Sequence, residues 1–202
     1  MRNNICNILR ERIVNLYYKP GDPLNEKKLA QEFGVSRTPI REALICLSEE
    51  SLVTIIPNTG TRVADINIHD FQKLIELRLI LERGVARLAV QNTTEAQIQD
   101  LELLYDRIKR VKDDDISELI ACDMRFHQII EQASHNQLLT KYLSNIRNQF
   151  FRIQTLLSHK PERMRTDLPK VIQALKEKNG DEMEQLMVDH VKHFVEKVRN
   201  SF

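Results

Sequence analysis

An acidic and an imidazole side chain lie one helical turn apart inside an apolar pattern. Apolar residues recur at helical spacing between Ile116 and Ile130, and Asp123 and His127 fall in the middle of that stripe. Because a buried carboxylate is costly without a partner, the pair predicts either a structural hydrogen bond in the core or a metal site. A carboxylate and an imidazole at this spacing converge on one point, which is the geometry that metal binding needs.

Two more polar residues fall on or beside apolar helical stripes. Arg78 lies centrally on the stripe that begins at Phe71, with Glu82 one turn further on. Arg78 could form a purely structural ion pair with Glu82, or its guanidinium could bind a carboxylate ligand through two parallel hydrogen bonds. His190 flanks the core face of the last helical pattern and is able to reach inward.

Two arginines near the N-terminus have the spacing of a DNA-reading helix. In the stretch "FGVSRTPIREALICL", Ser36 is a plausible N-cap, so Arg37 and Arg41 share one face at the leading end of the helix. Each can make a paired contact to guanine O6 and N7, worth about 1–3 kcal/mol of discrimination. Thr38 between them suits a phosphate or a thymine methyl group. Without further context, the pair could equally be a solvated helix face.

The surrounding segment supplies that context. "NEKKLAQEF" predicts a short helix capped by Asn25, "GVS" predicts a tight turn, and the arginine helix follows. "LVTII", "PNTG" and "TRVADI" then predict a two-stranded hairpin with Gly60 at its tip. We therefore expect a winged helix-turn-helix domain over residues 1–66, whose second helix enters the major groove.

Residues 67–202 are helical in period almost throughout and predict about six helices, so the fold class is mainly α: a winged domain followed by an all-α bundle. The net charge of +1 favours no class of partner, and residues 1–66 carry nine Lys/Arg against eight Asp/Glu. Any DNA surface must therefore come from the placement of charge. No apolar run is long enough to cross a membrane and no signal-peptide pattern is present, so we expect a cytoplasmic protein. The three cysteines show no CxxC spacing and are expected to be reduced thiols.

The N-terminal motifs resemble a known family. "PGDPLNEKKLAQEFGVSRTPIREAL" followed by "TGTRV" is similar to the DNA-binding domain of the GntR superfamily of bacterial transcription regulators, over residues 8 to about 65. One departure is Ser51, where the family usually has glycine. The resemblance implies that five residues occupy DNA-contacting positions: Lys27, Arg37, Thr38, Arg41 and Gly60.

The C-terminal motifs resemble the FCD ligand-sensing domain of the FadR subfamily. They are "LRLILERGVARLAV", "DMRFHQIIEQASHNQLL" and "GDEMEQLMVDHV", within residues 70 to 198. That family commonly holds a divalent metal by one aspartate and three histidines and senses small organic acids. Asp123, His127 and His190 match three of these ligands, and Leu168 takes the place of the fourth.

The missing fourth ligand leaves two alternatives for this domain. Three protein ligands could hold a zinc, nickel or manganese ion with an open position. Alternatively the metal is lost, and the same polar residues grip an effector directly together with Arg78.

The leading hypothesis is a ligand-responsive transcription regulator that binds a palindromic operator as a homodimer and senses a small carboxylic acid. An architectural DNA-binding protein without an effector is one alternative, but its dimerisation domain would not need polar residues on apolar stripes. A metal-dependent hydrolase is another, but no HExxH, GxSxG or phosphate-binding glycine loop is present. We therefore expect no enzyme activity.

Overall fold

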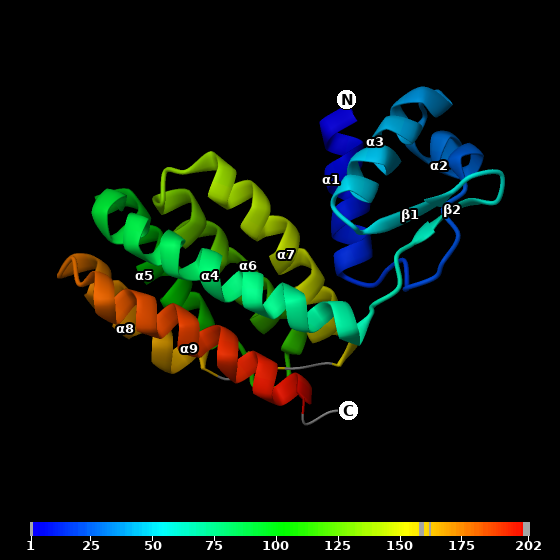
Figure 1. Cartoon of the computed structure of the whole chain (residues 1–202). Coiled ribbons are helices and arrows are strands. Elements are labelled where there is room, and N and C mark those ends of the chain that lie inside the picture. The colour runs from blue at the N-terminus through cyan, green and yellow to red at the C-terminus, as the bar shows by residue number, and fades with distance from the viewer. Residues whose placement is uncertain (1, 158–159, 162, 200–202) are drawn as a thin grey trace. The chain divides into compact units, whose positions relative to one another are not determined.

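The computed structural model describes residues 2–157, 160–161 and 163–199. The chain folds into two compact units (Figure 1). The first comprises Met1–Asn67 with Asn148–Ile153, and the second Ile68–Arg147 with Gln154–Phe202. None of the helices in the described part of the chain is long and apolar enough to cross a membrane.

The first unit has the winged helix-turn-helix architecture that the sequence predicts (Figure 1). Its elements in chain order are α1 (Arg2–Val14), α2 (Glu26–Phe33), α3 (Arg37–Glu49), β1 (Val53–Ile56) and β2 (Gly60–Val63). The two strands are antiparallel.

The turn between α2 and α3 follows from its local sequence. The Asn25 side chain caps α2 by accepting hydrogen bonds from the backbone N–H groups of Lys27 and Lys28, at 2.9 and 3.1 Å. Gly34 ends α2 in the left-handed conformation, with φ of 65°. Ser36 occupies the N-cap position of α3 with extended backbone, although its side chain makes no capping hydrogen bond to the described residues.

A separate hydrophobic core holds these elements together. α1 contributes Leu9 and Ile13, while α3 contributes Leu44 and Leu47, and all four are almost completely buried. Since these residues recur at helical spacing, each helix turns one apolar face inward and leaves its opposite face exposed. On α3, Arg37 and Arg41 lie on the exposed surface of the first turns.

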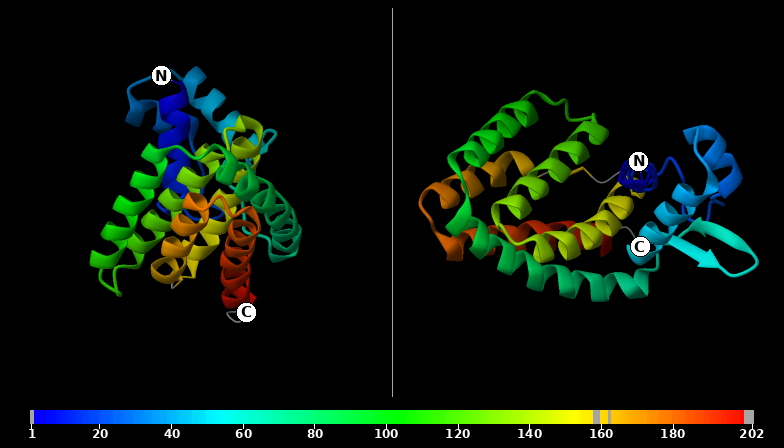
Figure 2. Two further views of the ribbon diagram at one scale, coloured as in Figure 1. Left: turned by 90° about the vertical axis from the view of Figure 1, so that its left-hand side faces the viewer. Right: turned by 90° about the horizontal axis from the view of Figure 1, so that it is seen from above.

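The second unit is all-helical in the residues described, as the sequence predicts. It contains α4 (Ile68–Asn92), α5 (Glu95–Arg110), α6 (Ile116–Ala133), α8 (Met164–Lys176) and α9 (Gly180–Arg199), together with α7 (Gln137–Leu156) apart from the segment Asn148–Ile153, which belongs to the first unit. The long helix α4 lies side by side with α9, and it also packs on α6 (Figure 2). Residues on α4, α6 and α9 can therefore meet although they are far apart in sequence.

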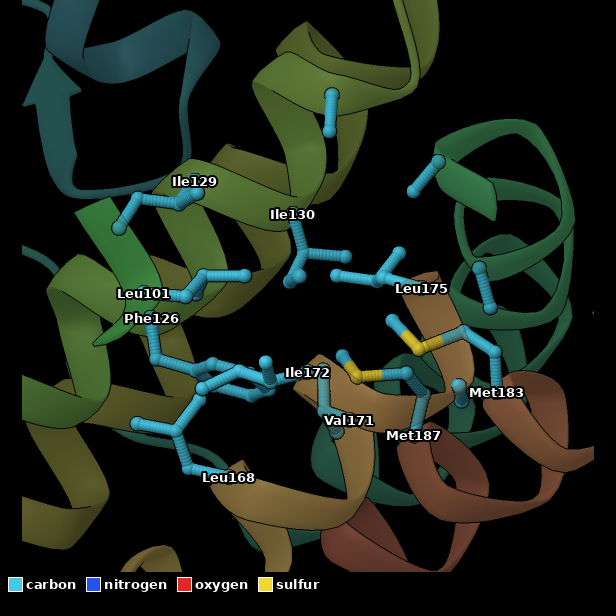
Figure 3. Packing of buried hydrophobic residues seen from close by; sticks show 14 of the residues in the cluster. Leu101, Phe126, Ile129, Ile130, Leu168, Val171, Ile172, Leu175, Met183 and Met187 are labelled. Atoms are coloured by element: carbon cyan, nitrogen blue, oxygen red, sulfur yellow. The ribbon is translucent and has the colours of Figure 1, made fainter. Parts of the chain in front are cut away.

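The core of the helical unit is apolar, and α6 contributes to it from Cys122 to Ala133. Phe126 from α6 packs among side chains of α8 and α9, which include Leu168, Val171 and Met187 (Figure 3). Leu168 is only 1% exposed. Its position therefore faces inward, as expected from the sequence, and is filled by packing.

Candidate functional site

Five polar side chains from three helices meet inside the helical unit. α4 supplies Arg78 and Glu82, α6 supplies Asp123 and His127, and α9 supplies His190. The first four are 5% exposed or less, and the His190 side chain is 11% exposed. The structure thus brings together every residue that the sequence suggested for the effector site.

Three of these residues aim donor atoms at one another. Nε2 of His190 lies 3.1 Å from Oδ1 of Asp123, and Nε2 of His127 lies 3.9 Å from the same oxygen. One ligand atom from each of the three residues lies within 4.8 Å of the other two. Two bonds of about 2.0–2.2 Å to one ion span at most about 4.4 Å, which covers the separations of 3.1 and 3.9 Å from Oδ1 of Asp123. One carboxylate with two imidazoles is a donor set that suits zinc and similar metals. These residues therefore fit a divalent ion.

Each histidine has a carboxylate near its other ring nitrogen. Nδ1 of His127 lies 3.7 Å from Oε1 of Glu82, and Nδ1 of His190 lies 3.8 Å from Oδ2 of Asp167. Histidines that bind metals usually face such a partner, which orients the ring and raises its basicity. Glu82 and Asp167 therefore lie where they could orient the two rings.

Asp167 was not identified from the sequence, although a signal was present. Its neighbour Leu168 packs in the same apolar core as Phe126 and cannot bind a metal. Asp167 lies on the same helical face as Met164 and Val171 and is 4% exposed. A carboxylate on that apolar stripe was the same kind of signal that identified Asp123.

Arg78 contacts both the acidic and the imidazole parts of the cluster. Its Nε donates to Oε1 of Glu82 at 3.1 Å, and its Nη2 lies 3.2 Å from Nε2 of His127. Because arginine only donates, Nε2 is the acceptor in this contact and the ring proton lies on Nδ1, toward Glu82. The same nitrogen cannot accept this hydrogen bond and coordinate a metal, so metal binding requires Arg78 to release it.

The environment sets the two histidines in different charge states. Burial, together with the nearby charges of Arg78 and His190, holds the pKa of His127 well below 6.5. Burial also opposes the charged form of His190, but its hydrogen bond to Asp123 and the charge of Asp123 raise its pKa to about 9. At neutral pH His127 is thus a neutral imidazole, and His190 carries a proton that is shared with Asp123.

The polar row continues along α6 beyond these residues. Glu131, one turn after His127, is 2% exposed and forms an ion pair with Arg147 of α7. Burial raises the pKa of Glu131 to about 7, although Arg147 opposes this shift. Neither residue was identified from the sequence, yet Glu131 extends the four-residue spacing of Asp123 and His127.

In the first unit, the predicted DNA-contacting residues are exposed. Lys27 on α2, Arg37, Thr38 and Arg41 at the start of α3, and Gly60 at the hairpin all lie on the surface. Gly60 has φ of 134° and open space around the position of a Cβ atom. That backbone conformation is strained for other residues, so glycine suits this position. Gly60 does not lie at the tip of the hairpin, where the sequence predicted it, but is the first residue of β2 and pairs with Ile56.

Arg41 is not free in the absence of DNA. Its Nε and Nη2 donate to the two carboxylate oxygens of Glu26 on α2, at 3.1 and 3.0 Å. The Arg41 side chain is 64% exposed, so solvent screens the pair and it contributes little to stability. Glu26 instead orients the guanidinium and competes with any DNA group that would occupy the same two N–H donors.

Removal of this competing carboxylate should strengthen DNA binding and reduce its selectivity. In Glu26→Gln, Arg41 loses its anionic partner, and one negative charge disappears from the surface that we expect to face DNA. We expect random DNA to bind several-fold more tightly, because non-specific affinity follows phosphate electrostatics. Titrations of operator and random DNA at fixed salt measure this change. Glu42→Gln, an exposed carboxylate on α3, serves as the matched control, and equal effects of both changes would contradict a special role for Glu26.

Comparisons with known proteins match both units. Residues 1–63 match the family of bacterial regulatory proteins called the gntR family. Residues 73–193 match the FCD domain.

Individual relatives are transcription regulators. The chain is 34% identical to the HTH-type transcriptional repressor RspR of Escherichia coli, over 98% of this chain and 89% of that protein. It is 30% identical to the gluconate operon transcriptional repressor of Bacillus subtilis, over 69% of this chain and 57% of that protein. The solved structure of McbR/YncC from E. coli has the same fold, with a TM-score of 0.85 at 21% identity, and the match covers 99% of this chain and 97% of that one. The chain therefore belongs to the GntR family of bacterial transcription regulators, with an FCD domain after its DNA-binding domain, and it is not an enzyme.

Proposed function

We propose that the FCD domain senses a small carboxylic acid and that its binding changes the affinity of the regulator for its operator. The observation that carries this proposal is the meeting of Arg78, Asp123, His127 and His190 in a buried place. Burying four ionisable groups is costly, and a purely structural bundle has no need of them. A guanidinium beside a carboxylate–imidazole cluster offers the charge and geometry that recognise an organic acid.

We further propose that Asp123, His127 and His190 hold a divalent ion such as zinc, nickel or manganese. When bound, the ion would supply positive charge and an open coordination position for an oxygen of the effector. Glu82 and Asp167 would orient the two histidine rings from behind. Leu168 offers no donor atom, so the fourth ligand of such an ion would have to come from solvent or from the effector.

Arg78 is the residue that would couple metal binding to effector binding. Its hydrogen bond to Nε2 of His127 has to be given up when that nitrogen binds a metal. The freed N–H donors of Arg78 can then take the carboxylate of the effector, while Glu82 keeps the side chain in place at Nε. Arg78 thus exchanges an internal partner for an external one, which gives the effector a preference for one state of the domain.

The class of effector is supported by one relative. The gluconate operon transcriptional repressor carries the name of a hydroxycarboxylic acid. Hydroxy acids and dicarboxylic acids can place one oxygen on a metal and a carboxylate on an arginine, so these are the compounds to screen first.

We propose that the regulator acts as a homodimer on a palindromic operator and represses transcription. Two related proteins are named as repressors. Helix-turn-helix proteins usually read two half-sites that are related by a two-fold axis. The effector can shift DNA affinity only by its difference in affinity for the two states of the dimer, typically about 1–3 kcal/mol.

Arg78→Ala tests the sensing function. An operator is first isolated by selection from random DNA, and its binding is followed by fluorescence anisotropy with hydroxy- and dicarboxylic acids. We expect the variant to bind the operator within about threefold of the native protein but to lose the response to the acid. Arg83→Ala removes an exposed arginine of the same helix and is the matched control. A full response in Arg78→Ala would make Arg78 a structural residue and contradict the proposed site.

A further inference from the structure

Two cysteines meet within the DNA-binding unit. Cys6 lies on α1 and Cys46 lies on α3, the helix that carries Arg37 and Arg41. The Sγ atoms are 3.2 Å apart, and Cys6 donates its thiol hydrogen to Cys46. Both thiols are reduced in the structure. An S–S bond is about 2.05 Å long, so a movement of little more than 1 Å would join them.

A charged pair borders the two thiols. Nη2 of Arg10 lies 3.3 Å from Sγ of Cys6, while Arg10 also makes two hydrogen bonds of 2.6 Å to the carboxylate of Glu50. Cys46 donates to Oε1 of Glu50 at 3.6 Å. The guanidinium thus lies beside the sulfur of Cys6, while the thiol of Cys46 has the Glu50 carboxylate as a hydrogen-bond acceptor.

The two sulfurs differ in access to solvent. Cys6 is 4% exposed and belongs to the hydrophobic core, whereas Cys46 is half-buried at the edge of that core. A small oxidant therefore reaches Cys46 first. Burial, and to a lesser extent the hydrogen bond to Cys46, raises the pKa of Cys6 to about 12. Cys6 therefore stays a thiol while Cys46 reacts.

We propose that Cys6 and Cys46 are a redox modification site, in which a hydroperoxide converts the two thiols into an intrachain disulfide. This bond would join α1 covalently to the DNA-reading helix α3. No part of it depends on the metal or the effector of the FCD domain.

The reaction needs only the two thiols and one peroxide. Sγ of Cys46 attacks one peroxide oxygen and gives up its thiol proton, the O–O bond breaks, and the departing alkoxide or hydroxide takes that proton and leaves as an alcohol or water. Cys46 is then a sulfenic acid. Sγ of Cys6 attacks Sγ of Cys46, the S–S bond forms, and hydroxide leaves and takes the Cys6 proton as water. Two thiols are oxidised, and one peroxide is reduced to one alcohol or water plus one water.

A metal site is the alternative interpretation of the same residues. Cys6, Cys46 and Glu50 could also offer three ligand atoms to one ion. However, Glu50 is already engaged by both hydrogen bonds from Arg10, whose charge would repel a cation at this place. The contacts therefore favour bond formation between the sulfurs.

The test exposes the full-length protein to a small excess of hydrogen peroxide, followed by alkylation in denaturant and peptide mapping. We expect the loss of two thiols per chain, one crosslinked peptide pair containing Cys6 and Cys46, and full reversal by dithiothreitol. Amides of α1 and α3 should exchange hydrogen more slowly in the oxidised protein, because the crosslink restricts their opening.

Single variants separate the roles of the two sulfurs. In Cys6→Ser, Cys46 has no resolving thiol and should proceed to sulfinic acid, while Cys46→Ser should leave Cys6 largely unmodified. Cys122→Ala, which changes the cysteine of the helical unit, should keep the crosslink. The proposal is overturned if native protein yields only overoxidised Cys46, a crosslink between chains or no reaction. It is also overturned if zinc added alone binds stoichiometrically and protects both thiols.

Discussion

Replacement of Arg41 by alanine should abolish the preference for operator over random DNA while the protein remains folded. Arg41 is exposed at the start of α3, and its guanidinium can donate two hydrogen bonds to O6 and N7 of a guanine. Each lost guanine contact costs about 1–3 kcal/mol, so specific affinity should fall roughly 10- to 100-fold for each half-site. The free energy of unfolding should change little, because solvent screens the Arg41–Glu26 ion pair.

The measurement is a pair of anisotropy titrations with operator and random DNA at the same salt concentration. Lys28→Ala is a useful control, since Lys28 is an exposed cation on α2 next to the expected contact residue Lys27. We expect Lys28→Ala to lower the affinity for operator and for random DNA by similar factors, as the loss of a phosphate contact does. If Arg41→Ala also weakened both DNAs equally, Arg41 would contact the backbone and α3 would not read bases through it.

The second large effect concerns the metal. Native, tag-free protein should contain about one divalent ion per chain, and His127→Ala should contain almost none. This change removes one of the three donors that the described residues bring together, and Leu168 cannot compensate for it. Asp167→Asn should retain the site but weaken it by roughly 10- to 100-fold, because it removes a second-shell carboxylate behind His190.

Elemental analysis measures the metal content, and titration of the chelator-treated protein measures the affinity. His135→Asn is a control histidine change outside the cluster, at a loop position with φ of 53° that asparagine tolerates. A native protein that held no ion and took none up would contradict the three-ligand site. Gain of a metal in Leu168→His would then identify a former metal site that has lost its fourth ligand. In that case the effector would have to be bound by Arg78 and the histidines alone.

Local sequence determined the elements of this protein and the faces on which its polar residues lie. The winged domain could be predicted because caps, turn residues and strand alternation act over a few neighbouring residues, as Asn25, Gly34 and Gly60 do. Asp123, His127 and Arg78 could be assigned to buried positions because helical periodicity alone places them on apolar stripes.

Tertiary structure decided which of these residues meet. Asp123 and His190 are 67 positions apart, and Cys6 and Cys46 are 40 apart, so only the packing of one helix on another brings each pair into contact. The same holds for Asp167 behind His190 and for Glu26 beside Arg41. Periodicity states which face of a helix is buried, but the partner and the atom that it contacts depend on how the helices cross and on their relative shift along the axis.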